Sequence, residues 1–330
     1  MKETLNRLIN HEILSKNDAK LILVNIAKGE YNTSQIAAFL TVYMMRSITI
    51  EELEGFRDAL LELCLAIDLA EFNPIDLCGT GGDGKDTFNI STLASFVTAG
   101  AGIKVTKHGN YGVSSKCGSS NVMEFLGIKF SNDPDFLRKS IETAGICVLH
   151  APLFHPAMKN VAPIRKELAV KTFFNMLGPM VNPAFPKNQM VGVFNLELAR
   201  MYGYLYQNTE KNFTILHALD GYDEISLTGA TKTISNASEG ILYPSDFGVS
   251  TISPNAIIGG EDIAHSAQLF LDILKGKGSE AQNHVVCANA GVAIATVEHI
   301  SLKEGFEKAK ESLLAGKGLE ALKKLQALNK

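Results

Sequence analysis

A dense run of glycines is the feature that most constrains this chain. Gly79, Gly81, Gly82 and Gly84 stand within six residues, between an apolar run typical of a strand and a segment typical of a helix start. Glycine lets the backbone turn sharply and approach a ligand with no Cβ in the way, and unpaired amides at a helix start attract anions. The run therefore predicts a pyrophosphate-binding loop in an α/β fold, with a merely flexible loop as the alternative.

The residues after the glycines favour binding over simple flexibility. Asn89, Ser91 and Thr92 stand at the expected mouth of the helix, where their side chains can add donors to those of the backbone. Lys85 is followed by Asp86, so the Gly-Lys-Ser/Thr end of a Walker A loop is missing, and we do not expect the Gly-x-Gly-x-x-Gly loop of dinucleotide folds either. We therefore expect a phosphate site of another class.

The first 70 residues carry only helical signals. Ser15 fits the cap of one helix, Thr33 or Ser34 opens another, and Thr49 with Glu52 forms a capping box before a third. No group in this segment suggests chemistry. We expect a small N-terminal all-helical domain over residues 1–70, with extra helices from about 160 to 180, that serves as a scaffold or a subunit interface.

From Pro74 onward, β-rich runs alternate with helical patterns, which predicts an α/β domain with a mostly parallel sheet over residues 74–330. Ligands of such sheets bind beyond the carboxyl ends of the strands. The C-terminal segment 302–330 is amphipathic and is expected to form a helical pair. The strands are expected at 75–78, 103–106, 146–150, 190–194 and 213–217, and helices between them at 93–100, 134–144 and 196–207.

Composition excludes several classes of protein. The 330 residues include 46% hydrophobic and 20% charged residues, within the globular range, and the length suggests one large and one smaller domain. A net charge of -4 disfavours a nucleic-acid partner. We find neither a membrane-spanning run nor a signal-peptide pattern, so we expect no membrane association and a cytoplasmic location. Five scattered cysteines form no Cys-x-x-Cys pair, and Cys117 has no base nearby in sequence that would favour a nucleophilic role.

A second polar loop follows the next expected strand. Residues 107–120 combine Lys107, His108 and Asn110 with several serines and glycines. Lysine supplies a point charge for phosphate, and hydroxyl and backbone donors can bind the remaining oxygens. Two such loops in one domain indicate a substrate with phosphates at both ends, with a solvated polar loop as the alternative.

Two further motifs carry charge suited to ligands. Asp223 and Glu224 are adjacent carboxylates that can bind magnesium together with water and substrate phosphate, although an acidic doublet alone is usually surface. Pro163 fits a helix start and would place Arg165 in the first turn, where the helix dipole disfavours a cation. Arg165 could therefore bind a substrate carboxylate, the alternative being a surface salt bridge with Glu167 or another acid.

Taken together, these four motifs resemble those of the anthranilate phosphoribosyltransferases, a class that also includes pyrimidine nucleoside phosphorylases. The resemblance covers essentially the whole chain, with the motifs in matching order. It implies transfer of the phosphoribosyl group from phosphoribosyl pyrophosphate to the amine of anthranilate in tryptophan biosynthesis, two magnesium ions per subunit, and a homodimer formed through the helical domain.

The resemblance also implies roles for individual residues. Magnesium would be held by Ser91, Asp223 and Glu224. Anthranilate would contact Gly79, His108, Asn110, His155, Arg165, Gly178 and Pro179, with Arg165 on its carboxylate. Phosphoribosyl pyrophosphate would contact Gly79, Gly82, Asp83, Thr87, Asn89, Ile90, Ser91, Thr92, Lys107, Asn110, Gly112, Val113, Ser114, Ser115 and Ser119.

The chain departs from the family pattern at three positions. Tyr111 stands where many relatives have arginine, and Cys117 and Asn121 replace a commoner serine and aspartate. Because tyrosine lacks the positive charge of arginine, Tyr111 is expected to affect the affinity for the sugar phosphate more than the type of reaction. No catalytic residue is certain, and His108 is the candidate general base.

Two alternatives stay open on sequence alone. A pyrimidine nucleoside phosphorylase would share the fold but would need the acidic pair less, since it uses inorganic phosphate. A non-catalytic nucleic-acid-binding relative should have a basic surface and eroded metal ligands, and the acidic pI of about 6.1 argues against it.

Overall fold

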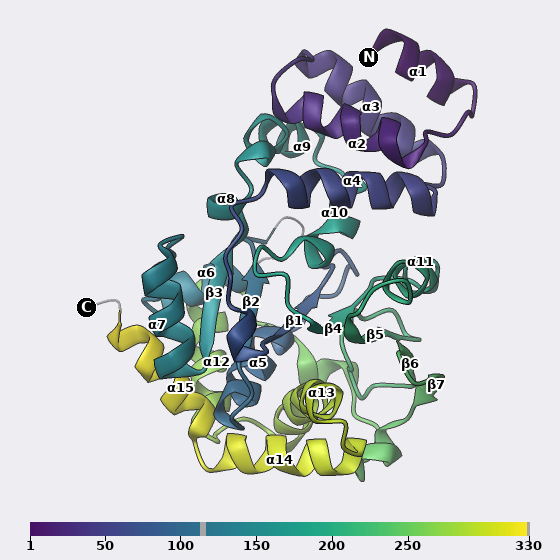
Figure 1. Cartoon of the computed structure of the whole chain (residues 1–330). Coiled ribbons are helices and arrows are strands. Elements are labelled where there is room, and N and C mark those ends of the chain that lie inside the picture. The colour runs from purple at the N-terminus through teal and green to yellow at the C-terminus, as the bar shows by residue number, and fades with distance from the viewer. Residues whose placement is uncertain (113–116, 329–330) are drawn as a thin grey trace. The chain divides into compact units, whose positions relative to one another are not determined.

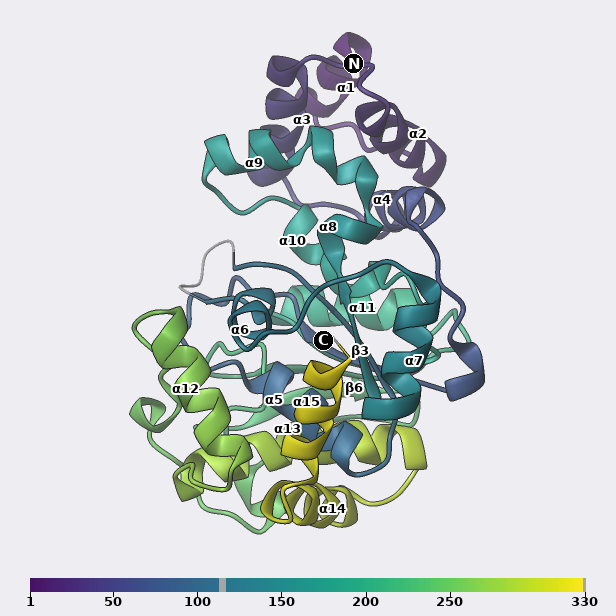
Figure 2. The same cartoon turned by 90° about the vertical axis from the view of Figure 1, so that its left-hand side faces the viewer.

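The structure, a computed structural model, describes residues 1–112 and 117–328 of the chain. Two compact units result. Residues 1–67 and 151–185 form the helical unit, and residues 68–150 and 186–330 form the sheet unit. The architecture confirms the predicted class, a helical domain plus an α/β domain (Figures 1 and 2).

Local capping residues define the N-terminal helices of the helical unit. Ser15 accepts a bond from the Asp18 amide, and Thr49 and Glu52 cap each other's backbone amides, as predicted. Thr33 is the first residue of its helix, but the cap is Asn32, which pairs with Gln35. The helices are α1 (Lys2–Ile9), α2 (Lys16–Ala27), α3 (Thr33–Met45) and α4 (Ile50–Leu63).

The segment 151–185 returns to this unit as short helical pieces. Phe173 stacks on Phe56 of α4 with ring centroids 4.4 Å apart, and both rings pack edge-on against Phe39 and Tyr43 of α3. This aromatic cluster ties the returning segment to the N-terminal helices. The pieces are α8 (Ala151–Phe154), η2 (Pro156–Asn160), α9 (Ala162–Leu168), α10 (Phe174–Leu177) and η3 (Gly178–Val181).

Strands of the sheet unit run in the order β3-β2-β1-β4-β5-β6-β7 among the described residues. The first five are parallel, and β6 and β7 continue the sheet antiparallel. The two antiparallel strands were not predicted, and the second and fourth expected strands are shifted by about two residues. The strands are β1 (Ile75–Gly79), β2 (Val105–Gly109), β3 (Ile146–His150), β4 (Asn188–Gly192), β5 (Asn212–Ala218), β6 (Thr231–Ser235) and β7 (Glu239–Leu242).

The strand order locates a ligand site. From β1 the chain adds β2 and β3 on one side, then β4 and β5 on the other. Such a reversal opens a crevice beyond the carboxyl ends of the two central strands, where open α/β sheets bind ligands. Here the central strands are β1 and β4.

Helices of the sheet unit pack against its strands. They are η1 (Ala70–Phe72), α5 (Ile90–Gly100), α6 (Ser119–Phe125), α7 (Pro134–Ala144), α11 (Leu196–Tyr206), η4 (Pro244–Phe247), η5 (Pro254–Ile257), α12 (Ile263–Leu274), α13 (Glu280–Glu298), α14 (Leu302–Leu314) and α15 (Lys317–Ala327). The last two are the predicted C-terminal pair. Within the described ranges, no single helix is long and apolar enough to cross a membrane, and the bent pair α13 and α14 passes that test only when joined.

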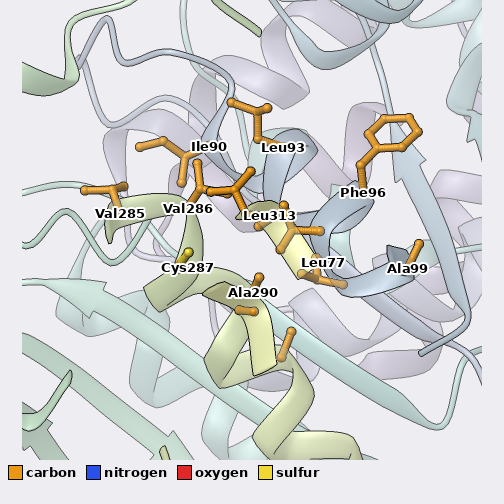
Figure 3. Packing of buried hydrophobic residues seen from close by; sticks show 14 of the residues in the cluster. Leu77, Ile90, Leu93, Phe96, Ala99, Val285, Val286, Cys287, Ala290 and Leu313 are labelled. Atoms are coloured by element: carbon orange, nitrogen blue, oxygen red, sulfur yellow. The ribbon is translucent and has the colours of Figure 1, made fainter. Parts of the chain in front are cut away.

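An apolar core holds the strand and the helix that flank the glycine loop. Leu77 of β1 and Leu93 and Phe96 of α5 pack with Val286 and Ala290 of α13 (Figure 3). All five are buried. Because these side chains lock α5 against the sheet, the start of α5 is held at a fixed place beside the end of β1.

Candidate functional site

The glycine loop leaves the carboxyl end of β1 in a conformation that needs glycine. Gly81, Gly82 and Gly84 have φ of 65°, 75° and 74°, the left-handed region that residues with a Cβ rarely adopt. The Thr80 amide donates to the Gly192 carbonyl at 2.9 Å, which extends the pairing of β1 with β4 by one residue. The loop is therefore a shaped turn anchored to the sheet.

Far from the glycines in sequence, the segment 257–259 holds the other end of the loop. The Gly259 amide donates to the Asp86 carbonyl at 2.7 Å, and Thr87 forms a β-bridge with Ile258. Helix α5 begins at Ile90 with Asn89 at the cap position, three residues before the predicted start at residue 93. Both ends of the predicted phosphate loop are thus fixed by backbone pairing.

The spacing of the glycines alone does not distinguish this loop from the glycine-rich loops of dinucleotide-binding folds. Gly79, Gly81 and Gly84 have the Gly-x-Gly-x-x-Gly spacing of those folds. Here, however, the helix begins only at Ile90, well after Gly84. The extended stretch between them leaves the loop backbone beside acidic groups from another part of the chain.

Those acidic groups are Asp223 and Glu224, in the loop after β5. The Gly81 amide donates to Asp223 Oδ2 at 2.7 Å, and the Ser91 amide donates to Glu224 Oε1 at 3.3 Å. The chain folds so closely here that a Cβ on Gly79 would lie 2.4 Å from Asp223 Oδ2. The first and third sequence motifs, about 140 residues apart, therefore converge on one place.

Burial raises the pKa of both carboxyl groups. Asp223 is 7% exposed and Glu224 is 9% exposed. Burial, with repulsion from Glu224 and Asp83, raises the pKa of Asp223 well above its usual range. Burial also raises the pKa of Glu224 to about 7, against the opposing charge of Lys107. Bringing a cation to these oxygens would relieve the repulsion, which is the behaviour expected of metal ligands.

Oxygen donors of this kind suit magnesium. Across residues 1–112 and 117–328, no three His, Cys, Asp or Glu side chains are grouped so as to hold an ion by themselves. A cation here would need water or ligand oxygens to complete its shell, as magnesium commonly has in phosphate sites. The donor set fits an ion that arrives with a phosphate.

Lys107 lies beneath the site instead of facing solvent. Its side chain is 2% exposed, and Nζ donates to the Leu77 carbonyl at 2.8 Å. Burial lowers the pKa of Lys107, while the carboxylates of Asp76 and Glu224 oppose that shift. The ammonium group therefore supplies positive charge that opposes the raised pKa of Glu224.

The second polar loop is only partly described. His108 is buried at the end of β2, and its amide donates to Asp76 Oδ1 at 3.3 Å. Asn110 is exposed, and its carbonyl accepts bonds from the Ser120 amide and the Ser119 hydroxyl. Asn89 Nδ2 donates to the Cys117 carbonyl at 3.1 Å, which links the two phosphate loops. The predicted contacts Val113, Ser114 and Ser115 lie outside the described residues.

Arg165 belongs to the helical unit, and its position corrects one argument from sequence. Helix α9 has only seven residues, so Arg165 lies in its last turn, where the helix dipole favours a cation. The expected alternative, a salt bridge, is also wrong, because no ion pair among the described residues involves Arg165. Its Nη2 donates to Asn175 Oδ1 at 3.4 Å, its guanidinium lies 5.3 Å from the Phe174 ring centroid, and burial lowers its pKa.

The remaining predicted residues of the helical unit differ in exposure. His155 is buried, and burial lowers its pKa to about 4 despite hydrogen bonds with the backbone at Val181 and Leu60. Gly178 is exposed at the start of η3, and Pro179 is buried. At neutral pH the His155 ring is therefore uncharged.

Sequence reasoning missed the residues that hold the acidic pair in place. The Asn289 carboxamide accepts from the Ile225 amide at 3.0 Å and donates to the Ile225 carbonyl at 2.9 Å. Gly192 lets β4 approach so closely that a Cβ there would meet the Asp223 carbonyl at 1.5 Å. An asparagine among the apolar residues 285–294 was the one signal in the sequence for Asn289. Gly192 carried none.

Two family models match nearly the whole chain. One describes the α/β domain of a glycosyl transferase family and matches residues 72–319, and the other describes its helical bundle domain and matches residues 2–64. The order of the two models agrees with the order of the helical and α/β segments.

Full-length relatives are named anthranilate phosphoribosyltransferase. The protein of Flavobacterium psychrophilum is 77% identical over 329 residues, 100% of both chains. That of Cytophaga hutchinsonii is 57% identical over 325 residues, 98% of this chain and 99% of the relative. Among solved structures, the Thermus thermophilus enzyme has a TM-score of 0.91 at 31% identity, covering 98% of each chain. The Saccharomyces cerevisiae enzyme in complex with PRPP and Mg has a TM-score of 0.90 at 26% identity, covering 98% of this chain and 96% of that one.

Proposed function

The chain belongs to the anthranilate phosphoribosyltransferase family, and from that premise we propose which of its residues carry the reaction. It transfers the phosphoribosyl group of phosphoribosyl pyrophosphate to the amine of anthranilate, a step of tryptophan biosynthesis that releases pyrophosphate. The amine nitrogen bonds to the anomeric carbon, the bond from that carbon to the pyrophosphate oxygen breaks, and the nitrogen loses a proton. Roles for single residues are hypotheses that rest on the contacts described above.

The pyrophosphate is proposed to bind on the glycine loop and the start of α5. In the structure, the Gly81 and Ser91 amides donate to Asp223 and Glu224. A diphosphate brings several anionic oxygens that can accept from these amides, and the acidic pair would then bind its cation. The convergence of loop amides and buried carboxylates is the observation that carries this proposal. We assign sugar pyrophosphate binding to Gly79, Gly82, Asp83, Thr87, Asn89 to Thr92, Asn110, Gly112 and Ser119, whereas the buried Lys107 is proposed to contribute through its charge.

Magnesium is proposed to bind at Asp223, Glu224 and Ser91, with two ions per subunit. Two carboxylates with raised pKa values and a nearby hydroxyl offer oxygen ligands and leave room for phosphate oxygens. When bound, the ion neutralises charge that develops on the leaving pyrophosphate. Lys107 is proposed to act through its charge on Glu224.

Anthranilate is proposed to bind through its carboxylate to Arg165. The guanidinium is positioned by Asn175 and Phe174 and carries no competing carboxylate among the described residues, so it can take a substrate acid. We assign further contacts to Gly79, His108, Asn110, His155, Gly178 and Pro179. His108 is the candidate base for the amine proton, a step that solvent or phosphate could also serve.

We further propose a homodimer formed through the helical unit and a cytoplasmic location. Large apolar side chains are exposed on the first three helices, including Met45 at 82%, and we propose that they lie in the dimer interface. Five free cysteines suit a reducing compartment. Light scattering of wild type and Met45→Glu tests the dimer, which the charge should weaken.

Anthranilate fluorescence offers a direct test of the activity. With sugar pyrophosphate and magnesium, the fluorescence should fall in proportion to product, and omission of magnesium should abolish the decrease. Phosphorolysis of thymidine or uridine, with no consumption of anthranilate, would instead indicate a nucleoside phosphorylase.

A further inference from the structure

The second polar loop is closed at its base by a set of contacts that we call the neck. The neck consists of Asn110, Tyr111 and Gly112 on one side and residues 118–121 on the other. Asn121 Oδ1 accepts from both the Gly112 amide and the Gly118 amide, each at 3.0 Å. The two sides lie so close that a Cβ on Gly118 would meet the Gly112 nitrogen at 2.1 Å. One carboxamide therefore joins both sides of the neck.

Tyr111 points from the neck toward α6 and β3. Its hydroxyl donates to Glu124, at 3.2 Å from Oε1 and 3.3 Å from Oε2. Partial desolvation and the Glu124 carboxylate raise the pKa of Tyr111, whose side chain is 38% exposed, so the phenol keeps its proton and remains the donor. Its ring lies edge-on to the His150 ring with centroids 4.8 Å apart. The side chain is thus held at both its ring and its hydroxyl.

The His150 ring that Tyr111 packs against is itself held in place by two contacts. It stacks on Phe130 with centroids 4.3 Å apart, and Nδ1 is hydrogen-bonded to the Ser120 hydroxyl at 2.9 Å. His150 is 5% exposed, and burial lowers its pKa. An uncharged, doubly held ring gives Tyr111 a fixed surface to pack against.

The backbone of Tyr111 in turn orients Asn110. The Tyr111 amide donates to Asn110 Oδ1 at 2.8 Å, which fixes which end of that carboxamide is the acceptor. The Asn110 carbonyl is bound by the Ser120 amide at 3.2 Å and by the Ser119 hydroxyl at 3.3 Å. Asn110 is therefore oriented by its neighbours in the neck before any ligand arrives.

We propose that Tyr111 is a positioning residue, which holds Asn110 for substrate through its contacts with Glu124 and His150. This inference rests on the proposed role of Asn110 in substrate binding. It also gives Tyr111 a role other than that of a missing cation.

Steady-state kinetics of the full-length enzyme, with both substrates varied and thermal unfolding measured in parallel, tests the role. Tyr111→Phe removes the bond to Glu124 and keeps the ring, so KM for sugar pyrophosphate and for anthranilate should each rise about three- to tenfold. The kcat and the unfolding temperature should stay near wild type. Tyr204→Phe, at an exposed tyrosine on α11, is the matched control and should leave both KM values unchanged.

Variants of Glu124, the hydrogen-bond partner of Tyr111, complete the test. Glu124→Ala should reproduce the effect of Tyr111→Phe, Glu124→Gln should retain most of the affinity because it keeps an acceptor, and the double variant Tyr111→Phe, Glu124→Ala should be no worse than either single one. Additive effects in the double variant would overturn the proposal, as would unchanged KM values in an otherwise active Tyr111→Phe enzyme. A wild-type protein that consumes no anthranilate would instead refute the proposed function, so the two failures are distinguishable.

Discussion

Substitution of Gly79 by alanine probes the closeness of the glycine loop to the acidic pair. The new Cβ would lie 2.4 Å from Asp223 Oδ2 and 3.0 Å from its Cγ. An unstrained carbon-to-oxygen contact needs roughly 3.4 Å, so the carboxylate must move by about 1 Å. That movement strains or breaks the 2.7 Å bond from the Gly81 amide to the same oxygen.

The expected effect follows from this displacement. A shift of about 1 Å in a catalytic group costs roughly 100-fold in rate, equivalent to about 2.7 kcal/mol of transition-state stabilisation. Gly79 lies outside the left-handed region, so alanine adds no backbone strain and the protein should fold. We expect kcat/KM for sugar pyrophosphate to fall about 100-fold in the fluorescence assay at saturating magnesium.

A second glycine provides the control. Gly240, on β7, has only the Thr233 hydroxyl at 4.0 Å from its would-be Cβ, and its φ is also outside the left-handed region. Gly240→Ala should therefore keep wild-type kinetics. A folded Gly79→Ala enzyme with kcat/KM equal to that of wild type would refute the geometry on which the magnesium and pyrophosphate assignments depend.

Further predictions concern the other charged groups of the two units. Arg165→Ala should raise KM for anthranilate about 10- to 100-fold with little change in KM for sugar pyrophosphate, and an equal loss for both substrates would argue against its role. Asp223→Asn with Glu224→Gln should lower magnesium-dependent turnover at least about 1000-fold. Because burial raises the pKa of both acids, the neutral side chains should leave the unfolding temperature in the absence of magnesium unchanged or higher, and a marked drop would contradict this account. His155, with a folded pKa of about 4 against 6.5 unfolded, takes up its proton mainly on unfolding as the pH falls from 7 to 4. Denaturant titrations should show that the unfolding free energy of wild type falls between pH 7 and pH 4 by about 3 kcal/mol more than that of His155→Asn. Equal losses in the two proteins would show that His155 is not held neutral.

Much of the fold was predictable because its signals are local. Ser15 and the Thr49 capping box start helices whose apolar faces are visible in sequence, and the helices of the C-terminal pair form where predicted. The cap Asn32 was missed because Thr33 and Ser34 beside it are equally good candidates. Strands β6 and β7 were missed because they are short and partly exposed.

The candidate site was predictable in its parts but not in its assembly. The glycine loop and the Asp223-Glu224 pair were found as separate motifs, since each has an unusual composition. Their supports come from distant parts of the chain. Gly192 and Asn289 act through close approach and burial, which depend on tertiary contacts that a single sequence does not reveal. Arg165 shows the opposite failure, because a helix start was predicted correctly and the shortness of the helix was not.

The most direct test of the central claim is a crystal structure of the protein with phosphoribosyl pyrophosphate and magnesium. We expect diphosphate oxygens within about 3.2 Å of the loop amides at Gly81 and Gly82, with the cation between the diphosphate and the carboxylates of Asp223 and Glu224. A diphosphate bound away from that turn, with the Gly81 amide still donating to Asp223, would contradict the account.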